Sequence, residues 1–295
     1  MDRLDRQDFT GLMTETMHET KTKPALLLGG TGKTGRRVAE RLTARGLPVR
    51  IGSRSGEPPF DWEDQATWAP VLQGVGAVYI TYYPDLAFPG AAETVEAFSK
   101  LAVRSGIRRL VLLSGRGEEG AEAAERAVQN TGADWTIVRC NWFSQNFSEF
   151  FLLDAVLSGE IALPAGDVAE PFVDADDIAD VVVAALTDDK HISQTYTLSG
   201  PRLLTFTDVA AEISKATNRD VRYVPLTVDQ YRAALSEMGL PTDFADLLTE
   251  ILDGRNASLR DGVQRALGRE PRDFSDYARD TAATGVWDGI RHPGA

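Results

Sequence analysis

Short apolar runs alternate along the chain with segments whose apolar residues recur every three or four positions. The short runs predict buried strands, and the periodic segments predict amphipathic helices. Strands are expected at 25–28, 48–54, 60–62, 75–83, 109–114, 134–139 and 195–198. Helices are expected between them, at about 33–45, 67–72, 90–105 and 118–130, and from about residue 174. This alternation predicts an α/β fold with a Rossmann-like, doubly wound parallel sheet.

The pattern changes after Pro201, where helical segments dominate. Helices are expected at 205–217, 227–238, 242–253 and about 273–283, with one short strand at 221–224. We expect this C-terminal part to form a smaller, mainly helical region over the strand ends.

A glycine-rich stretch joins the first predicted strand to the first predicted helix. Gly30, Gly32 and Gly35 fit the spacing G-x-G-x-x-G, and Gly29 in place of Gly30 gives the looser G-x-x-G-x-x-G. In a dinucleotide-binding unit such glycines make the turn, let the backbone approach a pyrophosphate and let the helix pack on the strand. The pyrophosphate lies at the helix N-terminus. A P-loop is excluded because Leu27 stands where that motif needs glycine, and an ordinary glycine-rich turn is the alternative.

The end of the second predicted strand reads Ser53-Arg54-Ser55. Enzymes that use NAD usually carry a carboxylate there for the ribose 2′-hydroxyl, whereas a 2′-phosphate is bound by arginine. We therefore expect NADP(H) as the cofactor, with Arg54 as its main contact and the two serines as hydrogen-bonding residues. A solvated arginine in a turn is the alternative.

The carboxyl ends of the other strands are expected to face the ligand crevice. Asp61 is expected either to bind the adenine amine or to cap the next helix. We expect at most one of Tyr82 and Tyr83 to meet substrate. The predicted cofactor-binding residues are Gly29, Thr31, Gly32, Lys33, Thr34, Gly35, Ser53, Arg54, Ser55, Asp61, Trp62, Thr81, Ser114 and Asn141.

The stretch from Cys140 to Phe147 is polar and aromatic. It predicts either a loop and helix that line the crevice or an amphipathic helix that only packs on the sheet. In the first case Trp142, Phe143 and Asn146 bind substrate together with Tyr83.

Three parts of the chain are expected from these features. Residues 1–23 are polar and are expected to be a disordered leader. Residues 24–200 are expected to form the NADP-binding Rossmann domain, with 140–170 contributing to the pocket. Residues 201–295 are expected to form the mainly helical substrate-binding cap.

Composition excludes several classes of protein. The net charge of −13 argues against nucleic-acid binding, which needs a basic surface. No apolar run approaches the roughly 20 residues that cross a bilayer, and the leader is no secretory signal. One cysteine, Cys140, allows no internal disulfide and suits a reducing cytoplasm. We expect a cytoplasmic monomer or homodimer that acts on a small molecule.

The chain after the leader resembles the NmrA-like, atypical short-chain dehydrogenase family. The similarity rests on 29–35, 110–114, 134–139, 142–147, 171–179, 196–201 and 268–274. Residues 30–34, 53–55 and 60–62 most resemble the festuclavine and agroclavine dehydrogenases of ergot-alkaloid secondary metabolism and their bacterial relatives. This similarity implies an NADP cofactor and reduction of an iminium or conjugated bond. The family also includes quinone reductases, isoflavone-type reductases and redox sensors that bind NADP without turnover.

The chain departs from the general short-chain dehydrogenase pattern at the catalytic helix. That pattern places a serine at the end of the fifth strand and Tyr-x-x-x-Lys on the next helix, where the tyrosine donates a proton. Ser114 is in place, but the helix predicted at 118–130 contains neither tyrosine nor lysine. Its acidic part, 118–125, is expected to be a solvated face. Tyr82, Tyr83, Ser114 or solvent are the candidates to supply a proton where the reaction needs one.

Three functions fit these features. The first is an oxidoreductase that transfers hydride from NADPH to an iminium, quinone or enone without the Tyr–Lys pair. The alternatives are a non-catalytic NADP-binding redox sensor and a redox-neutral NADP-dependent epimerase. The aromatic residues that lead into the C-terminal region favour a small-molecule pocket and therefore the oxidoreductase. The three histidines (His18, His191 and His292) lack metal-ligand spacing, so no metal is expected.

Overall fold

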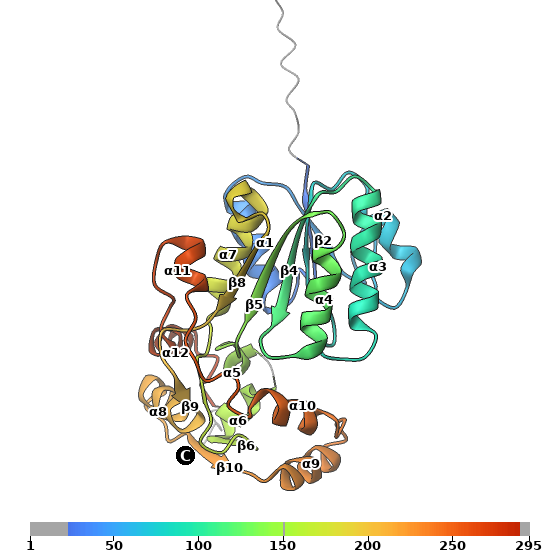
Figure 1. Cartoon of the computed structure of the whole chain (residues 1–295). Helices are drawn as coiled ribbons and strands as arrows, with labels where there is room; N and C mark the ends of the chain where they lie inside the picture. Colours follow the sequence, from blue (N-terminus) through green and yellow to red (C-terminus); the bar gives the residue numbers. More distant parts are fainter. Residues whose placement is uncertain (1–22, 150, 290–295) are drawn as a thin grey trace, which may run out of the picture.

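The computed structural model describes residues 23–149 and 151–289, and its centre is a six-stranded parallel sheet (Figure 1). The strand order is β2-β1-β3-β4-β5-β8. The parallel, doubly wound sheet expected from the sequence is confirmed. All but the last residue of the predicted leader lies outside the described residues. The strands of this sheet are β1 (Ala25–Leu28), β2 (Val49–Gly52), β3 (Ala77–Ile80), β4 (Arg109–Gly115), β5 (Asp134–Cys140) and β8 (Gln194–Leu198).

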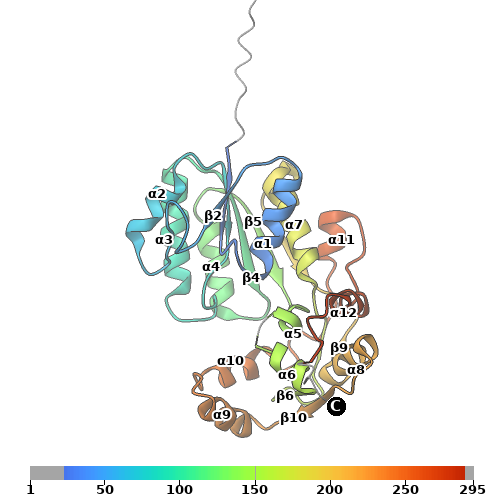
Figure 2. The ribbon, with the colours of Figure 1, turned by 180° about the vertical axis from the view of Figure 1, so that it is seen from behind.

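Helices cover both faces of the sheet (Figure 1 and Figure 2). In β1, Leu26 and Leu28 point into the core under α2, α3 and α4, whereas Leu27 points into the core under α1 and α7. Because successive side chains of a strand alternate between faces, a wholly apolar strand is buried on both sides. The flanking helices are α1 (Lys33–Ala44), α2 (Trp68–Leu72), α3 (Ala91–Arg104), α4 (Glu119–Gln129) and α7 (Ala175–Thr187), with the 3-10 turns η1 (Gln65–Thr67) and η2 (Asp189–His191).

A second lobe lies beyond the carboxyl ends of the strands, at the bottom of Figure 1. Its core is aromatic and includes Phe147, Phe172, Phe206 and Phe274. Two small ladders, β6–β10 and β7–β9, tie its segments together. Its elements are α5 (Asn146–Glu149), α6 (Leu153–Ser158), β6 (Glu160–Leu163), β7 (Ala169–Glu170), β9 (Leu204–Thr205), α8 (Phe206–Thr217), β10 (Arg222–Pro225), α9 (Val228–Glu237), α10 (Phe244–Ile251) and α12 (Phe274–Ala283).

Segments from each side of residue 200, the expected boundary between the domains, pack against elements from the other side. Before it, β6 pairs in parallel with β10 of the second lobe. After it, α11 (Gly262–Leu267) returns to the sheet and packs on β8 and α7. None of the helices in the described ranges is long and apolar enough to cross a membrane.

The strand expected at 60–62 was wrong, because this segment is a loop. The backbone groups of Asp61 bond to side chains instead of a neighbouring strand. The Asp61 N–H donates to the Thr67 hydroxyl at 3.0 Å, and the Asp61 carbonyl accepts from Trp68 Nε1 at 2.8 Å. Two prolines directly before it also lack the N–H that a ladder needs.

Candidate functional site

The glycine-rich turn lies at the carboxyl end of β1 and leads directly into α1. Gly29 has a φ of 62°, in the left-handed region, and its carbonyl accepts a hydrogen bond from the Gly32 N–H at 2.9 Å. A Cβ atom at Gly35 would collide with the Gly29 carbonyl, so the first turn of α1 rests against the strand end. Among the described residues, no side chain caps α1. The helix therefore presents backbone N–H groups at the crevice, as a pyrophosphate requires.

Two threonine hydroxyls form hydrogen bonds beside this turn. Thr81 Oγ1 donates to the Leu28 carbonyl at 2.8 Å and ties β3 to β1. Thr34 Oγ1 accepts a hydrogen bond from the buried Tyr79 hydroxyl at 3.0 Å. Thr31, by contrast, is exposed on the turn itself. Of these predicted cofactor-binding threonines, the structure places only the Thr31 side chain on the surface.

Ser53, Arg54 and Ser55 follow β2, which pairs with β1 and so brings them beside the turn. The Ser53 carbonyl accepts hydrogen bonds from the N–H groups of Gly56 and Phe60, at 3.0 and 2.8 Å, which fixes the loop. Arg54 is exposed, and within the described part of the chain no carboxylate lies at ion-pair distance from it. An exposed arginine thus follows β2 beside the turn that leads into α1.

Trp62 and Tyr82 meet at the end of β3. Trp62 Nε1 donates to the Thr81 carbonyl at 3.2 Å, and the Trp62 and Tyr82 rings lie 5.0 Å apart. The Asp61 carboxylate accepts from the Glu63 N–H at 3.1 Å and so stabilises a local turn. Asp61 and Trp62, two of the predicted cofactor-binding residues, therefore lie near the end of β3. The Asp61 carboxylate already accepts a hydrogen bond within its own loop.

Lys33 and two arginines make the start of α1 positive. Burial lowers the pKa of Lys33 to about 8. Arg36 and Arg37 form ion pairs with Glu149 of α5, at 2.8 and 2.7 Å. The second lobe is thereby bound to the helix that begins at the glycine-rich turn.

Two acidic side chains meet beyond the ends of β3 and β4. The carboxyl groups of Asp85 and Glu118 share a hydrogen bond. Burial, and then the neighbouring Asp85 carboxyl, raise the pKa of Glu118 to about 8, so that Glu118 carries a proton at neutral pH. Burial also raises the pKa of Asp85. Tyr83, two residues before Asp85, is 79% exposed.

Ser114 ends its strand inside the protein, where it is only 3% exposed. Its hydroxyl donates to Glu125 Oε1 of α4 at 2.5 Å. The same carboxylate binds Arg139 of β5 through two hydrogen bonds. The Ser114 proton is therefore directed at a buried carboxylate and not at the crevice.

Asn141 is buried at the carboxyl end of β5, and both ends of its amide are engaged. Oδ1 accepts from Arg116 Nη1 at 3.1 Å, and Nδ2 donates to Glu170 Oε2 at 3.2 Å. Burial raises the pKa of Glu170 to about 7. Glu170 Oε1 is buried and has no hydrogen-bond partner in the described part of the protein. In this network the Asn141 side chain has hydrogen-bond partners at both its oxygen and its nitrogen, whereas one carboxylate oxygen of Glu170 has no partner among the described residues.

The residues predicted to bind substrate after β5 point into different cores. Trp142 packs in the core of the second lobe, with its ring 5.6 Å from that of Phe206. Phe143 packs in the sheet core under α1 and α7. Asn146 begins α5 and is half-buried. The structure therefore does not bring Trp142 and Phe143 together on one surface.

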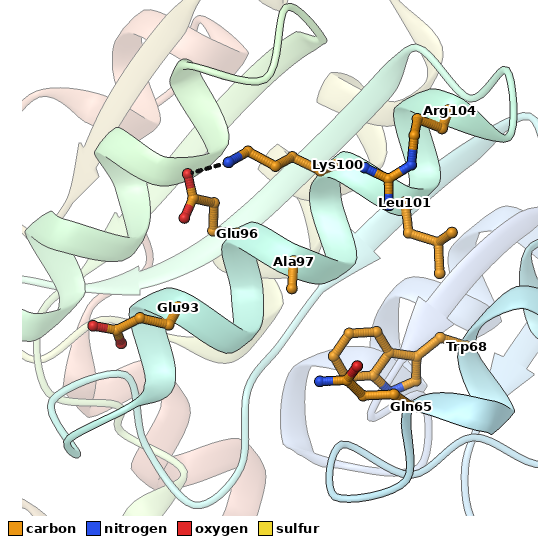
Figure 3. A pocket seen from close by; sticks show the side chains of 8 residues that line it. All are labelled: Gln65, Trp68, Glu93, Glu96, Ala97, Lys100, Leu101 and Arg104. Carbon is orange, nitrogen blue, oxygen red and sulfur yellow. Dashed lines mark ion pairs between the residues drawn. The ribbon is translucent and has the colours of Figure 1, made fainter.

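A cavity of about 470 Å³ lies away from these residues, between α2 and α3 (Figure 3). Trp68 and Gln65 lie across it from α3, whose Ala97 and Leu101 point toward Trp68. Its lining includes an ion pair of 2.7 Å between Lys100 and Glu96. No residue predicted to bind cofactor or substrate lines this cavity.

His191 is the histidine that falls within the described residues, and it is buried. Its Nδ1 lies 2.9 Å from the Tyr196 hydroxyl, so it belongs to a local hydrogen bond. Across the ranges that the structure describes, no group of three or more His, Cys, Asp or Glu residues could hold a metal ion.

The fold buries acidic residues of the segment 118–125, contrary to expectation. The helix 118–125 was expected to be a solvated face, yet Glu125 is only 3% exposed. The burial of Glu125 was predictable from the sequence, because position 125 falls on the same helix face as Ala121, Ala124 and Val128. Glu118 offered no such signal, because its partner Asp85 lies on a distant loop.

Two family models match the chain. A model for NAD(P)H-binding proteins covers residues 29–189, and a model for the NmrA-like family covers residues 122–278. Each match spans more than half of the chain, and both include residues of the site described above.

Individual proteins are similar over nearly the whole length. An uncharacterized oxidoreductase of Bacillus subtilis is 32% identical over 90% of this chain and 99% of its own. The agroclavine dehydrogenase of Claviceps fusiformis is 33% identical over 89% of this chain and 98% of its own. The NADPH complex of an Escherichia coli NADPH-dependent quinone oxidoreductase has a TM-score of 0.73 at 20% identity, over 87% of this chain and 99% of that one. The chain therefore belongs to the NmrA-like family of NAD(P)H-binding proteins and is an oxidoreductase of that family.

Proposed function

We propose that the protein transfers hydride from NADPH to a small organic acceptor with an iminium, quinone or enone group. The observation that carries the proposal is the turn from Gly29 to Gly35, which exposes the N-terminus of α1 beside Arg54. A pyrophosphate fits that helix end. An exposed guanidinium without a nearby carboxylate suits a 2′-phosphate and offers nothing to the ribose hydroxyls of NAD.

The names of relatives support the acceptor class. One relative is an agroclavine dehydrogenase, and one protein of the same fold is a quinone oxidoreductase. The cofactor supplies the hydride, and the protein supplies position and, where needed, a proton. Addition of hydride to an iminium carbon gives a neutral amine without a proton. A quinone or enone gains hydride at one atom and needs a proton at the oxygen or carbon that gains the charge.

Glu118 is the proton donor in this proposal. It carries a proton at neutral pH and lies beyond the ends of β3 and β4, where the crevice opens. Ser114 is disfavoured because it is only 3% exposed, whereas Glu118 is half-buried, and because its hydroxyl donates to the buried Glu125. Of the two tyrosines, Tyr83 is assigned to contact the acceptor, because it is exposed, whereas Tyr82 packs against Trp62. After transfer, the Glu118 carboxylate regains its proton from solvent.

Calorimetric titration with NADPH, NADP⁺, NADH and NAD⁺ tests the cofactor. Arg54→Asp should weaken NADPH binding about tenfold or more, because it removes charge-assisted hydrogen bonds to the 2′-phosphate. NADH binding should change little. Arg104→Asp, at an exposed site on α3, is the matched control and should leave both affinities unchanged. Equal NADPH affinities for Arg54→Asp and the wild type would refute the role of Arg54.

NADPH absorbance, followed with a panel of iminium, quinone and enone compounds, tests the reaction. Oxidation of NADPH by one class supports the proposal and names the acceptor. Tight binding of NADPH and NADP⁺ with no oxidation by any compound contradicts it, and favours a redox sensor or a redox-neutral reaction.

A further inference from the structure

A second cavity, of about 390 Å³, lies near the carboxyl ends of β5 and β8. Arginines contribute four of the six residues that line it, from β5, from the segment after β4 and from α11 with the segment before it. The volume falls within the roughly 300–1,000 Å³ of small-molecule sites. The lining residues are Arg116, Arg139, Thr197, Arg260, Asp261 and Arg265.

The charges of these arginines are only partly balanced. Arg139 pairs with Glu125 behind it. For Arg116, Arg260 and Arg265, the described residues provide no carboxylate at ion-pair distance, although Asp261 also lines the cavity. In a chain with a net charge of −13, this is a local excess of positive charge.

Arg116 is the buried member of the group, at 7% exposed. Its Nη1 donates to the Ser258 carbonyl at 2.7 Å and to Asn141 Oδ1 at 3.1 Å, and its Nη2 donates to Ser258 Oγ at 2.6 Å. Burial, and then the nearby charge of Arg260, lower the pKa of Arg116. The fold thus fixes one guanidinium in place and sets a second positive charge near it, which costs free energy unless an anion neutralises them.

Arg260 and Arg265 are exposed, so they can turn toward a ligand. Arg265 approaches the Tyr196 ring, with 5.4 Å between its guanidinium carbon and the ring centroid. Guanidinium groups bind phosphate oxygens through paired hydrogen bonds. We propose that this cavity is a second anion site, separate from the glycine-rich turn, which binds a phosphate-bearing ligand of two or more negative charges.

Calorimetric titration of the NADPH-saturated full chain with inorganic pyrophosphate tests the site, because NADPH covers the glycine-rich turn. We expect one pyrophosphate per chain, bound more weakly as salt concentration rises. In the double variant Arg260→Gln/Arg265→Gln, the affinity should fall at least tenfold. Arg45→Gln/Arg104→Gln removes the same charge from exposed sites on α1 and α3 and should bind as the wild type does.

Each result of these titrations either supports or overturns the proposed anion site. Absence of binding by the wild type, or equal affinity of the wild type and Arg260→Gln/Arg265→Gln, overturns the proposal. Each single variant, with a smaller loss, checks the result if the double variant is unstable. A parallel titration with ribose 5-phosphate separates two sources of the phosphate: tighter binding than pyrophosphate indicates an organic phosphate, and weaker binding indicates a free inorganic anion. If NADPH itself fails to bind, the difference between the two double variants still decides the question.

Discussion

Asp85 and Glu118 are two neighbouring carboxylic acids whose burial raises their pKa values. Each carboxyl group is half-buried, and each would face a negative neighbour if both ionised. One proton therefore stays on the pair at neutral pH. A general acid works best when its pKa lies near the operating pH, and this pair meets that condition at the edge of the proposed hydride site.

The variant Glu118→Gln tests whether Glu118 donates the proton in the reaction. With a quinone acceptor and saturating NADPH, kcat of the wild type should fall as pH rises through about 8, because Glu118 loses its proton there. Glu118→Gln should lower kcat about 100-fold, in line with the loss of a general acid. It should also remove this dependence on pH. With an iminium acceptor, both proteins should turn over alike.

Saturating NADPH is needed in this experiment because Lys33, at the start of α1 beside the proposed cofactor site, also has a pKa of about 8. Glu119→Gln, at the exposed neighbour, is the control and should keep the wild-type profile. Unchanged quinone reduction by Glu118→Gln would remove Glu118 from the mechanism.

The glycine-rich turn before α1 was predicted from the sequence, and the burial and pairing of the acidic residues were not. The glycines are recognised by their local spacing, and Arg54 by its place at the end of the next strand, which pairs with β1. The burial of Glu125 and the pairing of Glu118 depend on elements far away in the chain. Single-sequence patterns show such residues as surface charges until the fold places their partners.

Helix α1 begins at the glycine-rich turn and depends on it. Gly35→Ala should displace the Gly29 carbonyl and the first turn of α1, since the added Cβ meets that backbone atom. NADPH affinity, measured by calorimetry, should fall about tenfold or more. Gly46→Ala, just past the other end of α1, meets open space at a φ of 71°. It should cost about 1 kcal/mol of stability and leave NADPH affinity unchanged; a loss of affinity there as well would argue against a specific role for Gly35.

The β4–α4–β5 unit is fastened by Glu125, which binds both Ser114 and Arg139. Glu125→Ala leaves a half-buried guanidinium without its partner and should lower the free energy of unfolding by about 3 kcal/mol. Glu122→Ala, which removes an exposed pair with Arg126 on the same helix, should cost less than about 0.5 kcal/mol. Urea unfolding followed by circular dichroism gives both values, and similar losses would show that the buried pair is unimportant.

At the scale of elements, the long periodic helices agreed with expectation within a few residues. The missed elements are short: α6, β6, β7, β9 and α11 have six residues or fewer. Too few positions remain in such segments to reveal a period. The strand expected at 60–62 failed for a related reason, because three apolar and polar residues in a row do not distinguish a strand from a turn held by side chains.

The two lobes are interwoven, and this sets how the whole molecule unfolds. Arg269 pairs with Asp177 of α7 at 2.7 Å, and Arg37 of α1 pairs with Glu149 of the second lobe. We expect one cooperative unfolding transition, with circular dichroism and tryptophan fluorescence changing together.

Trp287→Ala tests this coupling from the far end of the chain. Trp287 is 1% exposed, and its Nε1 donates to the Phe147 carbonyl at 2.8 Å. Its loss should cost about 3–5 kcal/mol and shift the whole transition. Phe88→Ala, at a residue that is 39% exposed, should shift it far less. Separate transitions for the two signals would show lobes that unfold independently.

The placement of α11 also limits how copies of the protein can associate. Gly262 lies so close to the Thr197 carbonyl of β8 that a Cβ atom would collide with it, and α11 packs along that strand (Figure 1). The opposite edge strand, β2, has only four residues and follows a proline. Exposed edge strands are where sheets of separate molecules join, and short or covered edges prevent it. A homodimer of this chain would therefore be built from helical surfaces, and crowding at high concentration would not extend the sheet from one molecule into the next.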